Sequence, residues 1–431
     1  MPRGGQTSQN LPIAVTSLVP ADGTRMDNRE LLRRPGFRPL AVTYGLSEIV
    51  DWLTTIALAV LVYDATGSAV ATTILFVCSK FVPAFVAPGV TAHVDDVSPR
   101  RTLPALYALQ GAAFAGMALL GGNVAAVVAL ASVAGAAALV SRALVRASVA
   151  AALPDPDELR AGNALLNVVF SVAFAVGPAV AGAAVATLST GTTLYAGAGL
   201  LVLMALYTRG AALPRLVVSE DEADDSWLTK LRTGVTHLRN EPVVSRILSV
   251  QAVLLVFFTM VPPIEVVYAR EELGTTAAGL GVLMASWGLG AIAGSAVFAR
   301  LAKLNAVIVA AGATAAMGVA YLGMGLAGSL VLACALSVVG GVGNGMQWIA
   351  FVTTVQGRVP GALQARAMAL VESMGAAVPG LGFVLGGALA AGASARIAYL
   401  AAGAGILLVV AIAALALRGL PRAQVARTAA A

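Results

Sequence analysis

Long apolar stretches alternate with short polar connections along most of the chain. An α-helix of about 20 apolar residues is long enough to cross a hydrocarbon core of about 30 Å. Twelve stretches approach or exceed this length, at residues 40–62, 69–92, 103–121, 124–148, 163–187, 193–209, 244–268, 277–299, 305–326, 329–354, 364–390 and 395–417. The pattern therefore predicts an all-α polytopic membrane protein with twelve transmembrane helices.

One long polar segment separates the first six stretches from the last six. Pro154 and Arg160 precede the fifth stretch, and Pro360 and Arg366 precede the eleventh with the same separation. This similarity indicates two six-helix pseudo-repeats. We accordingly divide the chain into a flexible N-terminal tail (1–38), a six-helix bundle (39–209), a linker (210–243), a second six-helix bundle (244–418) and a C-terminal tail (419–431).

The linker combines an acidic run with apolar residues at helical spacing, beginning at Trp227. This pattern is typical of an amphipathic helix on the membrane surface. We interpret it as a connector between the bundles; a binding site for a partner protein is the alternative.

Basic residues indicate how the chain is oriented. Of the 27 lysines and arginines, only Arg270 and Arg396 fall in predicted outer loops, and Lys80 lies within the second stretch. The others lie in the tails, the linker, the inner loops or the inner ends of the helices. Because basic residues accumulate on the cytoplasmic side of membrane proteins, we expect both termini to be cytoplasmic.

Composition supports the membrane assignment and excludes several other classes. Hydrophobic residues make up 59% of the chain, charged residues 11%, and the mean hydropathy is +0.88, whereas soluble domains are about 25% charged. We attribute the net charge of +6 to membrane topology and expect no nucleic-acid partner. The two cysteines and two histidines are dispersed, so we expect no disulfide framework, no metal site and no intramembrane enzyme.

The first stretch contains a polar stripe. Tyr44, Glu48, Asp51 and Thr55 follow one another at spacings of four, three and four, which places them on one face of a helix. A carboxylate near the bilayer centre costs about 2.5–3.5 kcal/mol on an insertion scale. The stripe should therefore face protein or a water-filled cavity.

Lys80 lies in the middle of the second stretch, at the depth of Asp51 in the first, which predicts an ion pair. The two charges either neutralise each other permanently or take part in proton exchange. Two neighbouring carboxylates do not readily ionise together, so Asp51, with Glu48 one turn away, can bind a proton in one conformation and release it in another. We favour proton exchange and name Glu48, Asp51 and Lys80 as candidate proton-coupling residues.

Several further polar and aromatic residues lie at membrane depth. Each makes either an interhelical hydrogen bond or a contact with a substrate in a cavity between the two bundles. We expect the first, seventh, tenth and eleventh helices to line this cavity, and mixed aromatic and amide groups favour an amphipathic ligand. The candidates are Asn163, Asn167, Gln251, Phe258, Glu265, Asn344, Gln347, Trp348 and Glu372.

Three local motifs lie at the ends of predicted helices. They are Asp51-Trp52-Leu53 with Thr66-Gly67-Ser68, Leu153-Pro154 with Asn163-Ala164-Leu165, and Leu238-Arg239-Asn240 with Pro242. With these motifs, residues 37–418 resemble the major facilitator superfamily, in particular its bacterial drug-exporter branch of macrolide-efflux and enterobactin-exporter proteins. The resemblance implies a multidrug-resistance type of efflux protein in the inner (plasma) membrane of a bacterium.

Two motifs resemble the conformational elements of this superfamily. Asp96, Arg100 and Arg101 match its gating motif after the second helix, although Ala92 and Val97 depart from it. Gly177, Pro178 and Gly182 resemble the antiporter motif of exporters; close helix packing is the other explanation. Arg142 and Arg146 resemble the arginine of the fourth helix and act either in gating or as topology anchors at the membrane interface.

From these observations we predict a secondary active transporter that exports a small amphipathic or lipophilic compound, such as a drug, a secondary metabolite or a siderophore, in antiport with protons. Glycine pairs such as Gly288 and Gly290 lie inside apolar stretches, and no Walker-type sequence is present, so we expect the proton gradient, not ATP or a cofactor, to supply energy. We expect a monomer in the lipid bilayer with a small-molecule substrate. The alternatives are a uniporter or importer of the same fold, a non-transporting membrane sensor, and a lipid translocase.

Overall fold

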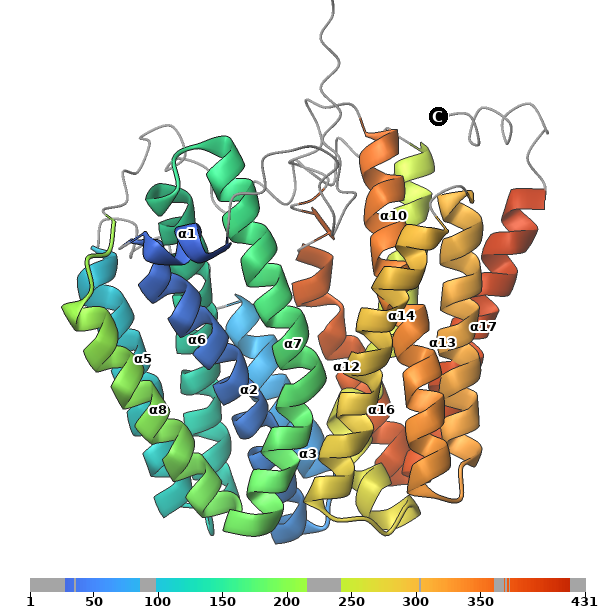
Figure 1. The fold of residues 1–431 in the computed structure, drawn as a ribbon. Helices are drawn as coiled ribbons and strands as arrows, with labels where there is room; N and C mark the ends of the chain where they lie inside the picture. The colour runs from blue at the N-terminus through green and yellow to red at the C-terminus, as the bar shows by residue number, and fades with distance from the viewer. Residues whose placement is uncertain are drawn as a thin grey trace, which may run out of the picture.

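The computed structural model describes residues 28–34, 36–85, 98–214, 242–301, 304–359, 368, 370–371 and 373–418, whose regular structure is entirely helical (Figure 1). In the N-terminal half (28–214) the helices are α1 (Asn28–Arg33), α2 (Phe37–Thr66), α3 (Ala69–Phe76), the π-helix η1 (Val77–Phe81), α5 (Pro99–Leu119), α6 (Val124–Ala152), α7 (Pro156–Leu188) and α8 (Thr190–Gly210). In the C-terminal half (242–418) they are α10 (Pro242–Thr259), η3 (Pro262–Ile264), α11 (Glu265–Val267), η4 (Tyr268–Glu272), α12 (Ala277–Arg300), α13 (Ala306–Leu326), α14 (Leu330–Arg358), α16 (Pro379–Gly392) and α17 (Ala395–Arg418).

Capping residues determine where several helices begin and end. Asp155 accepts hydrogen bonds from the backbone N–H groups of Asp157 and Glu158, and Pro156 occupies the first position of α7, where its missing N–H costs nothing. Gly67 ends α2 in the left-handed conformation, with φ of 59°, which glycine adopts without strain. Ser68 then caps α3 by accepting from the N–H of Ala71.

Eleven helices among the described residues are long and apolar enough to cross a membrane, which confirms a multi-pass membrane protein. Each corresponds to one predicted stretch. The predicted second stretch corresponds to the shorter apolar helix Ala69–Phe85, and residues 86–97 lie outside the described residues. Large apolar side chains such as Leu119 and Val331 are well exposed, as expected for residues that face lipid tails.

The helices form two groups that lie side by side (Figure 1). The start of α2, the start of α7 and the end of α17 lie at one end of the molecule, which we call the terminal face. The turns α2–α3 (67–68), α5–α6 (120–123) and α13–α14 (327–329) lie at the other end, which we call the distal face.

The two halves pack closely toward the distal face. A Cβ atom on Gly182 of α7 would lie 2.5 Å from the carbonyl oxygen of Ala277 and 2.8 Å from Cα of Gly281, so glycines allow α7 and α12 to touch backbone to backbone. Arg270 Nη2 lies 3.0 Å from Asp64 Oδ2, and the Tyr63 hydroxyl donates to Glu271 over 2.5 Å. These contacts between the halves close the distal end of the interface.

Candidate functional site

The polar stripe of α2 carries the two acidic residues of the candidate site, Glu48 and Asp51. Lys80 Nζ of η1 donates to Asp51 Oδ1 over 2.7 Å. Arg142 of α6 places Nη2 3.9 Å from Asp51 Oδ1 and Nη1 3.7 Å from Glu48 Oε1. We call Glu48, Asp51, Lys80 and Arg142 the charge cluster. It holds two acids and two bases, so its formal charges balance.

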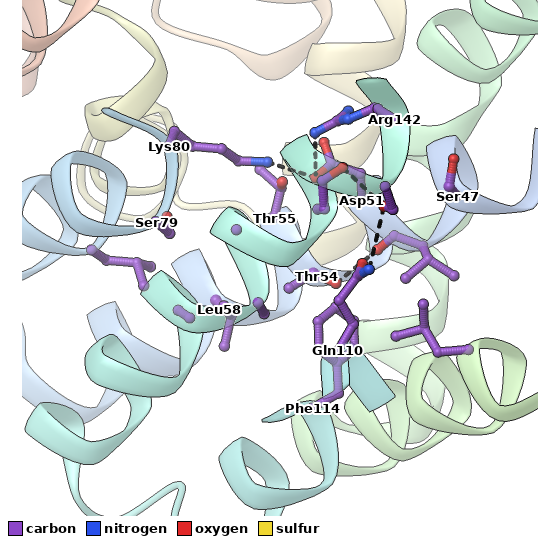
Figure 2. A pocket seen from close by; sticks show the side chains of 18 of the residues that line it. Ser47, Asp51, Thr54, Thr55, Leu58, Ser79, Lys80, Gln110, Phe114 and Arg142 are labelled. Carbon is purple, nitrogen blue, oxygen red and sulfur yellow. Dashed lines mark hydrogen bonds and ion pairs between the residues drawn. The ribbon is translucent and has the colours of Figure 1, made fainter. Parts of the chain in front are cut away.

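The members of the charge cluster differ in exposure. The Glu48 side chain is 6% exposed, whereas those of Asp51, Lys80 and Arg142 are 31%, 35% and 29% exposed. Lys80 and Arg142 approach Asp51 from different helices (Figure 2). Ion pairing and hydrogen bonding offset the cost of removing these charges from bulk water. Asp51 is therefore the carboxylate that is both paired and accessible.

Asp51 faces a cavity inside the N-terminal half. Its empty volume is about 660 Å³, part of it continuous with solvent, and its walls come from α2, α3, η1, α5, α6 and α8. Gln110 donates to Ser141 over 3.4 Å within this wall. Of the four helices that we expected around a substrate cavity, only the first lines this one. Its polar lining comprises Ser47, Asp51, Thr54, Thr55, Ser79, Lys80, Gln110, Ser141 and Arg142 (Figure 2).

A π-helical turn presents Lys80 to the cluster. In η1 the backbone widens, and the N–H of Val82 bonds to the carbonyl of Val77, five residues earlier. A Cβ atom on Gly135 of α6 would lie 2.1 Å from the Ser79 carbonyl oxygen, so only glycine accommodates this turn. Gly135 precedes Arg142 by seven residues, two helical turns, and so lies on the same face of α6. π-helical turns occur frequently at functional sites.

Arg146 extends the contact between α6 and the stripe. Its Nη2 donates to the Tyr44 hydroxyl over 3.4 Å, and its guanidinium carbon lies 5.9 Å from the centre of the Tyr44 ring. Arg142 and Arg146, one turn apart, therefore both face α2. This geometry makes them partners of the stripe, in addition to any role at the membrane interface.

The model of the transmembrane secretion effector family, within the major facilitator superfamily, matches residues 30–430. The chain belongs to this family. No match was found among curated proteins. The family assignment identifies the chain as a membrane transporter.

Solved structures of transporters share the fold of this transporter. The nucleoside transporter NupG has a TM-score of 0.69 and 14% identity, over 89% of this chain and 99% of that one. A POT family transporter in complex with 5-aminolevulinic acid has a TM-score of 0.67 and 14% identity, over 90% of this chain and 98% of that one. A D-xylose–proton symporter has a TM-score of 0.63 and 13% identity, over 86% of this chain and 96% of that one. At these identities the likeness establishes the fold alone.

In the C-terminal half of the transporter, several candidate residues contact one another. Gln347 donates to Gln251 over 2.7 Å, and both side chains are buried. Asn344 accepts from the indole N–H of Trp287 over 3.4 Å. These bonds join α10 to α14 and α12 to α14. Gln251, Asn344 and Gln347 therefore each make an interhelical hydrogen bond in this structure.

Phe258 and Trp348 belong to separate aromatic contacts. The Phe258 ring lies 6.0 Å from the Trp287 ring and 6.2 Å from the Tyr321 ring. Trp348 is 48% exposed and lies 5.8 Å from the ring of Phe351. The two aromatic candidates therefore have different neighbours: Phe258 contacts rings of α12 and α13, and Trp348 contacts a ring of its own helix, α14.

The remaining candidates of the transporter lie apart from the charge cluster. Asn163 and Asn167 are exposed on α7, and Arg100 and Arg101 are exposed at the start of α5.

Gly177 packs against Trp52, where a Cβ atom would lie 2.4 Å from Cδ1. Pro178 and Gly182 line the contact of α7 with α12. Glu265 lines a small cavity between the halves; Asp96 and Glu372 lie outside the described residues.

Proposed function

We propose that this transporter exports a small amphipathic or lipophilic compound, such as a drug, a secondary metabolite or a siderophore, in exchange for protons. Export proceeds by rocker-switch alternating access in a bacterial cell membrane, with the terminal face in the cytoplasm. The position of Asp51 between Lys80 and Arg142, on the wall of a cavity inside the N-terminal half, carries this proposal.

The charge balance of the cluster explains how a proton changes conformation. With both carboxylates ionised, the cluster has no net formal charge. A proton on Asp51 leaves Lys80 and Arg142 with Glu48 as their remaining anionic partner, so Lys80 loses the attraction that holds it near α2. Inward proton movement supplies about 2.3 kcal/mol per charge per 100 mV. This energy is sufficient for concentrative export.

The distal contacts support the alternating-access part of the proposal. In the proposed orientation the distal face is extracellular, so the Asp64–Arg270 and Tyr63–Glu271 contacts close the outward path. Release of the compound requires these contacts to break. The small-residue contact between α7 and α12 then acts as the surface on which the halves rock.

An importer or uniporter of the same fold is the main competing function. A symporter moves its substrate and its protons in the same direction, and a uniporter moves no protons with its substrate. A membrane sensor or a lipid translocase would not couple the movement of a soluble dye to that of protons.

Inverted membrane vesicles distinguish these functions. Dyes, antibiotics and siderophores are added outside, and proton release from the acidified interior is followed with a pH-sensitive dye. We expect a transported compound to drive proton efflux from the vesicles, and a protonophore to abolish its uptake. Asp51→Asn should reduce coupled proton movement at least about tenfold, and Glu48→Gln less, because Asp51 faces the cavity.

Other outcomes of the vesicle experiment identify the competing functions. Proton and compound entering together indicates symport. Compound movement that is insensitive to a protonophore indicates a uniporter. Full proton exchange in both Asp51→Asn and Glu48→Gln overturns the assignment of coupling to these residues.

A further inference from the structure

A second, smaller cavity lies between the two halves. Its empty volume is about 200 Å³. Glu265 contributes its only carboxylate, and Thr55 contributes a hydroxyl from across the interface. The lining comprises Thr55, Ile56, Ala59 and Phe76 from the N-terminal half, and Pro262, Glu265, Val266, Leu280 and Met284 from the C-terminal half.

Glu265 has no polar partner in the described part of the chain. No hydrogen bond or ion pair among those residues involves its carboxyl group. The two arginines nearby in sequence or fold are engaged elsewhere, Arg270 with Asp64 and Arg396 with Glu272. Glu265 thus differs from Asp51, which has two basic partners.

The titratable groups around Glu265 carry no positive charge that would stabilise a carboxylate. Tyr321 of α13 and Tyr399 of α17 interact electrostatically with it. The buried Tyr399 hydroxyl has no hydrogen-bond partner among the described residues, and Tyr268, on the same segment as Glu265, donates to the Met324 carbonyl.

Of the elements packed against α11, η3 contains no acidic or basic residue, and α12 contains only Arg300, at its terminal-face end. The charged residues of η4 have partners elsewhere: Arg270 pairs with Asp64, Glu271 accepts from Tyr63, and Glu272 pairs with Arg396. On α2, Glu48 and Asp51 pair with Arg142 and Lys80, and Arg38 lies at the terminal-face start of the helix.

The cavity of Glu265 adjoins the cavity of Asp51. Thr55 and Phe76 line both. Thr55 lies one helical turn after Asp51, on the same face of α2. A hydroxyl in the shared wall can both donate and accept a hydrogen bond, so it can connect water in one cavity with the carboxyl group in the other.

We propose that Glu265 is a second proton-binding site, which takes a proton from water at the distal face as the halves close there and keeps it while that face is closed. In the closed state an ionised Glu265 would be an unpaired charge in an apolar cavity, which is unfavourable. While the halves are apart, water at the distal face solvates the ionised carboxylate; as they close, the carboxylate accepts a proton from that water and enters the cavity neutral. This proposal rests on the proposed function in one respect: the proton that Glu265 binds enters the same exchange of protons for the exported compound.

Spin labels on the distal face test this site directly, with the proton itself as the ligand. Gly122 and Gly328 lie in distal turns of opposite halves, and a Cβ atom on either would meet nothing within 4 Å. Labels are attached to Gly122→Cys and Gly328→Cys after Cys78 and Cys334 are replaced by serine. Their separation is then measured in lipid nanodiscs from about pH 5 to about pH 9, a range that spans shifted carboxyl titrations.

We expect acidification to increase the closed, short-distance population of the transporter with native Glu265, by at most about tenfold per pH unit for one coupled proton. Glu265→Gln, which imitates the protonated side chain, should remain closed across this range. It should also lose one protonated-carboxyl band in infrared titration. The exposed control Asp157→Asn, whose carboxyl group pairs with Arg160 on the surface, should titrate like the native protein.

Two results overturn the site: a native protein whose distances do not depend on pH, or Glu265→Gln retaining the native pH response and the infrared band. The test separates the site from the proposed function. If Asp51→Asn abolishes proton exchange while Glu265→Gln titrates normally, the proposed function stands and the second site fails. If Glu265→Gln removes the pH response but Asp51→Asn and Glu48→Gln exchange protons fully, the second site stands and the proposed coupling through Asp51 and Glu48 fails.

Discussion

Asp51 is held by two cations that come from different helices. Lys80 donates to it over 2.7 Å, and Arg142 lies 3.9 Å away while also reaching Glu48. The side chains of Asp51 and Lys80 are about one-third exposed to the cavity, so the pair is screened less than a surface ion pair and more than a dry one. Such an intermediate pair can be broken and re-formed at moderate cost.

Lys80→Met tests the contribution of this pair to stability. The substitution leaves Asp51 with the more distant Arg142, so we expect a loss of about 1–3 kcal/mol of stability, below the 3–5 kcal/mol typical of a fully buried pair. Thermal unfolding in detergent measures the loss. Asp51→Asn combined with Lys80→Met should recover most of it, because no unpaired charge remains. A double variant no more stable than Lys80→Met would show that the pair does not stabilise the fold.

For a single residue, the sequence predicts the polarity and the depth in the membrane, but not toward which neighbouring helix the side chain points. The stripe from Tyr44 to Thr55 and the pairing of Asp51 with Lys80 follow from spacing and depth. The approach of Arg142 to the same carboxylate depends on the rotation of α6 relative to α2, for which one sequence carries no signal. For the same reason the sequence indicated that Gln251 and Gln347 lie at membrane depth, but not that they bond to each other.

At the element scale, η1 and the facing surface of α6 form one structural unit. The π-helical turn brings the Ser79 carbonyl to the position that a side chain at residue 135 would occupy. Hydrophobic periodicity does not predict such a turn, because an α-helix and a π-helical turn can carry the same pattern of residues and differ in their hydrogen-bond register. Periodicity does predict where the long spans lie, because each requires a run of apolar residues to cross the bilayer.

Gly135→Ala should displace η1 from α6. A methyl group there must move the π-helical backbone, so we expect a destabilisation of about 1–3 kcal/mol and reduced transport. Gly199→Ala in α8 is the control: a Cβ atom there meets nothing within 4 Å, so the change should be neutral or stabilising by up to about 1 kcal/mol. Thermal unfolding of both variants measures the difference, and equal stabilities would contradict the account of η1.

At the scale of the whole molecule, the halves meet through small residues and close at the distal face. Gly182 and Gly281 allow backbone contact between α7 and α12, and Asp64 with Arg270 links the halves beside it. The sequence indicated the glycines and the repeat, but either packing or gating could explain them. The choice depends on whether the contact lies within a half or between halves, and the fold places it between them.

Gly182→Ala should shift the transporter toward conformations that are open at the distal face. Its methyl group would lie 2.5 Å from the Ala277 carbonyl oxygen, so the closed contact must loosen by about 1–2 Å. The distance between labels at positions 122 and 328 should increase accordingly. Gly191→Ala, where a Cβ atom meets nothing within 4 Å, should leave it unchanged; an unaltered distance in Gly182→Ala would exclude this contact as a distal gate.

In the proposed exchange, the Asp51–Lys80 pair transfers a proton and does more than neutralise charge. Replacing both residues by neutral polar side chains, Asp51→Asn with Lys80→Gln, removes both charges without leaving either unpaired, so the variant should remain folded. The measurement is proton movement per molecule of a transported dye in proteoliposomes. We expect that dye still crosses down its own gradient while the accompanying proton movement falls at least about tenfold. A folded double variant that moves as many protons per dye as the native protein would show that the pair only neutralises charge.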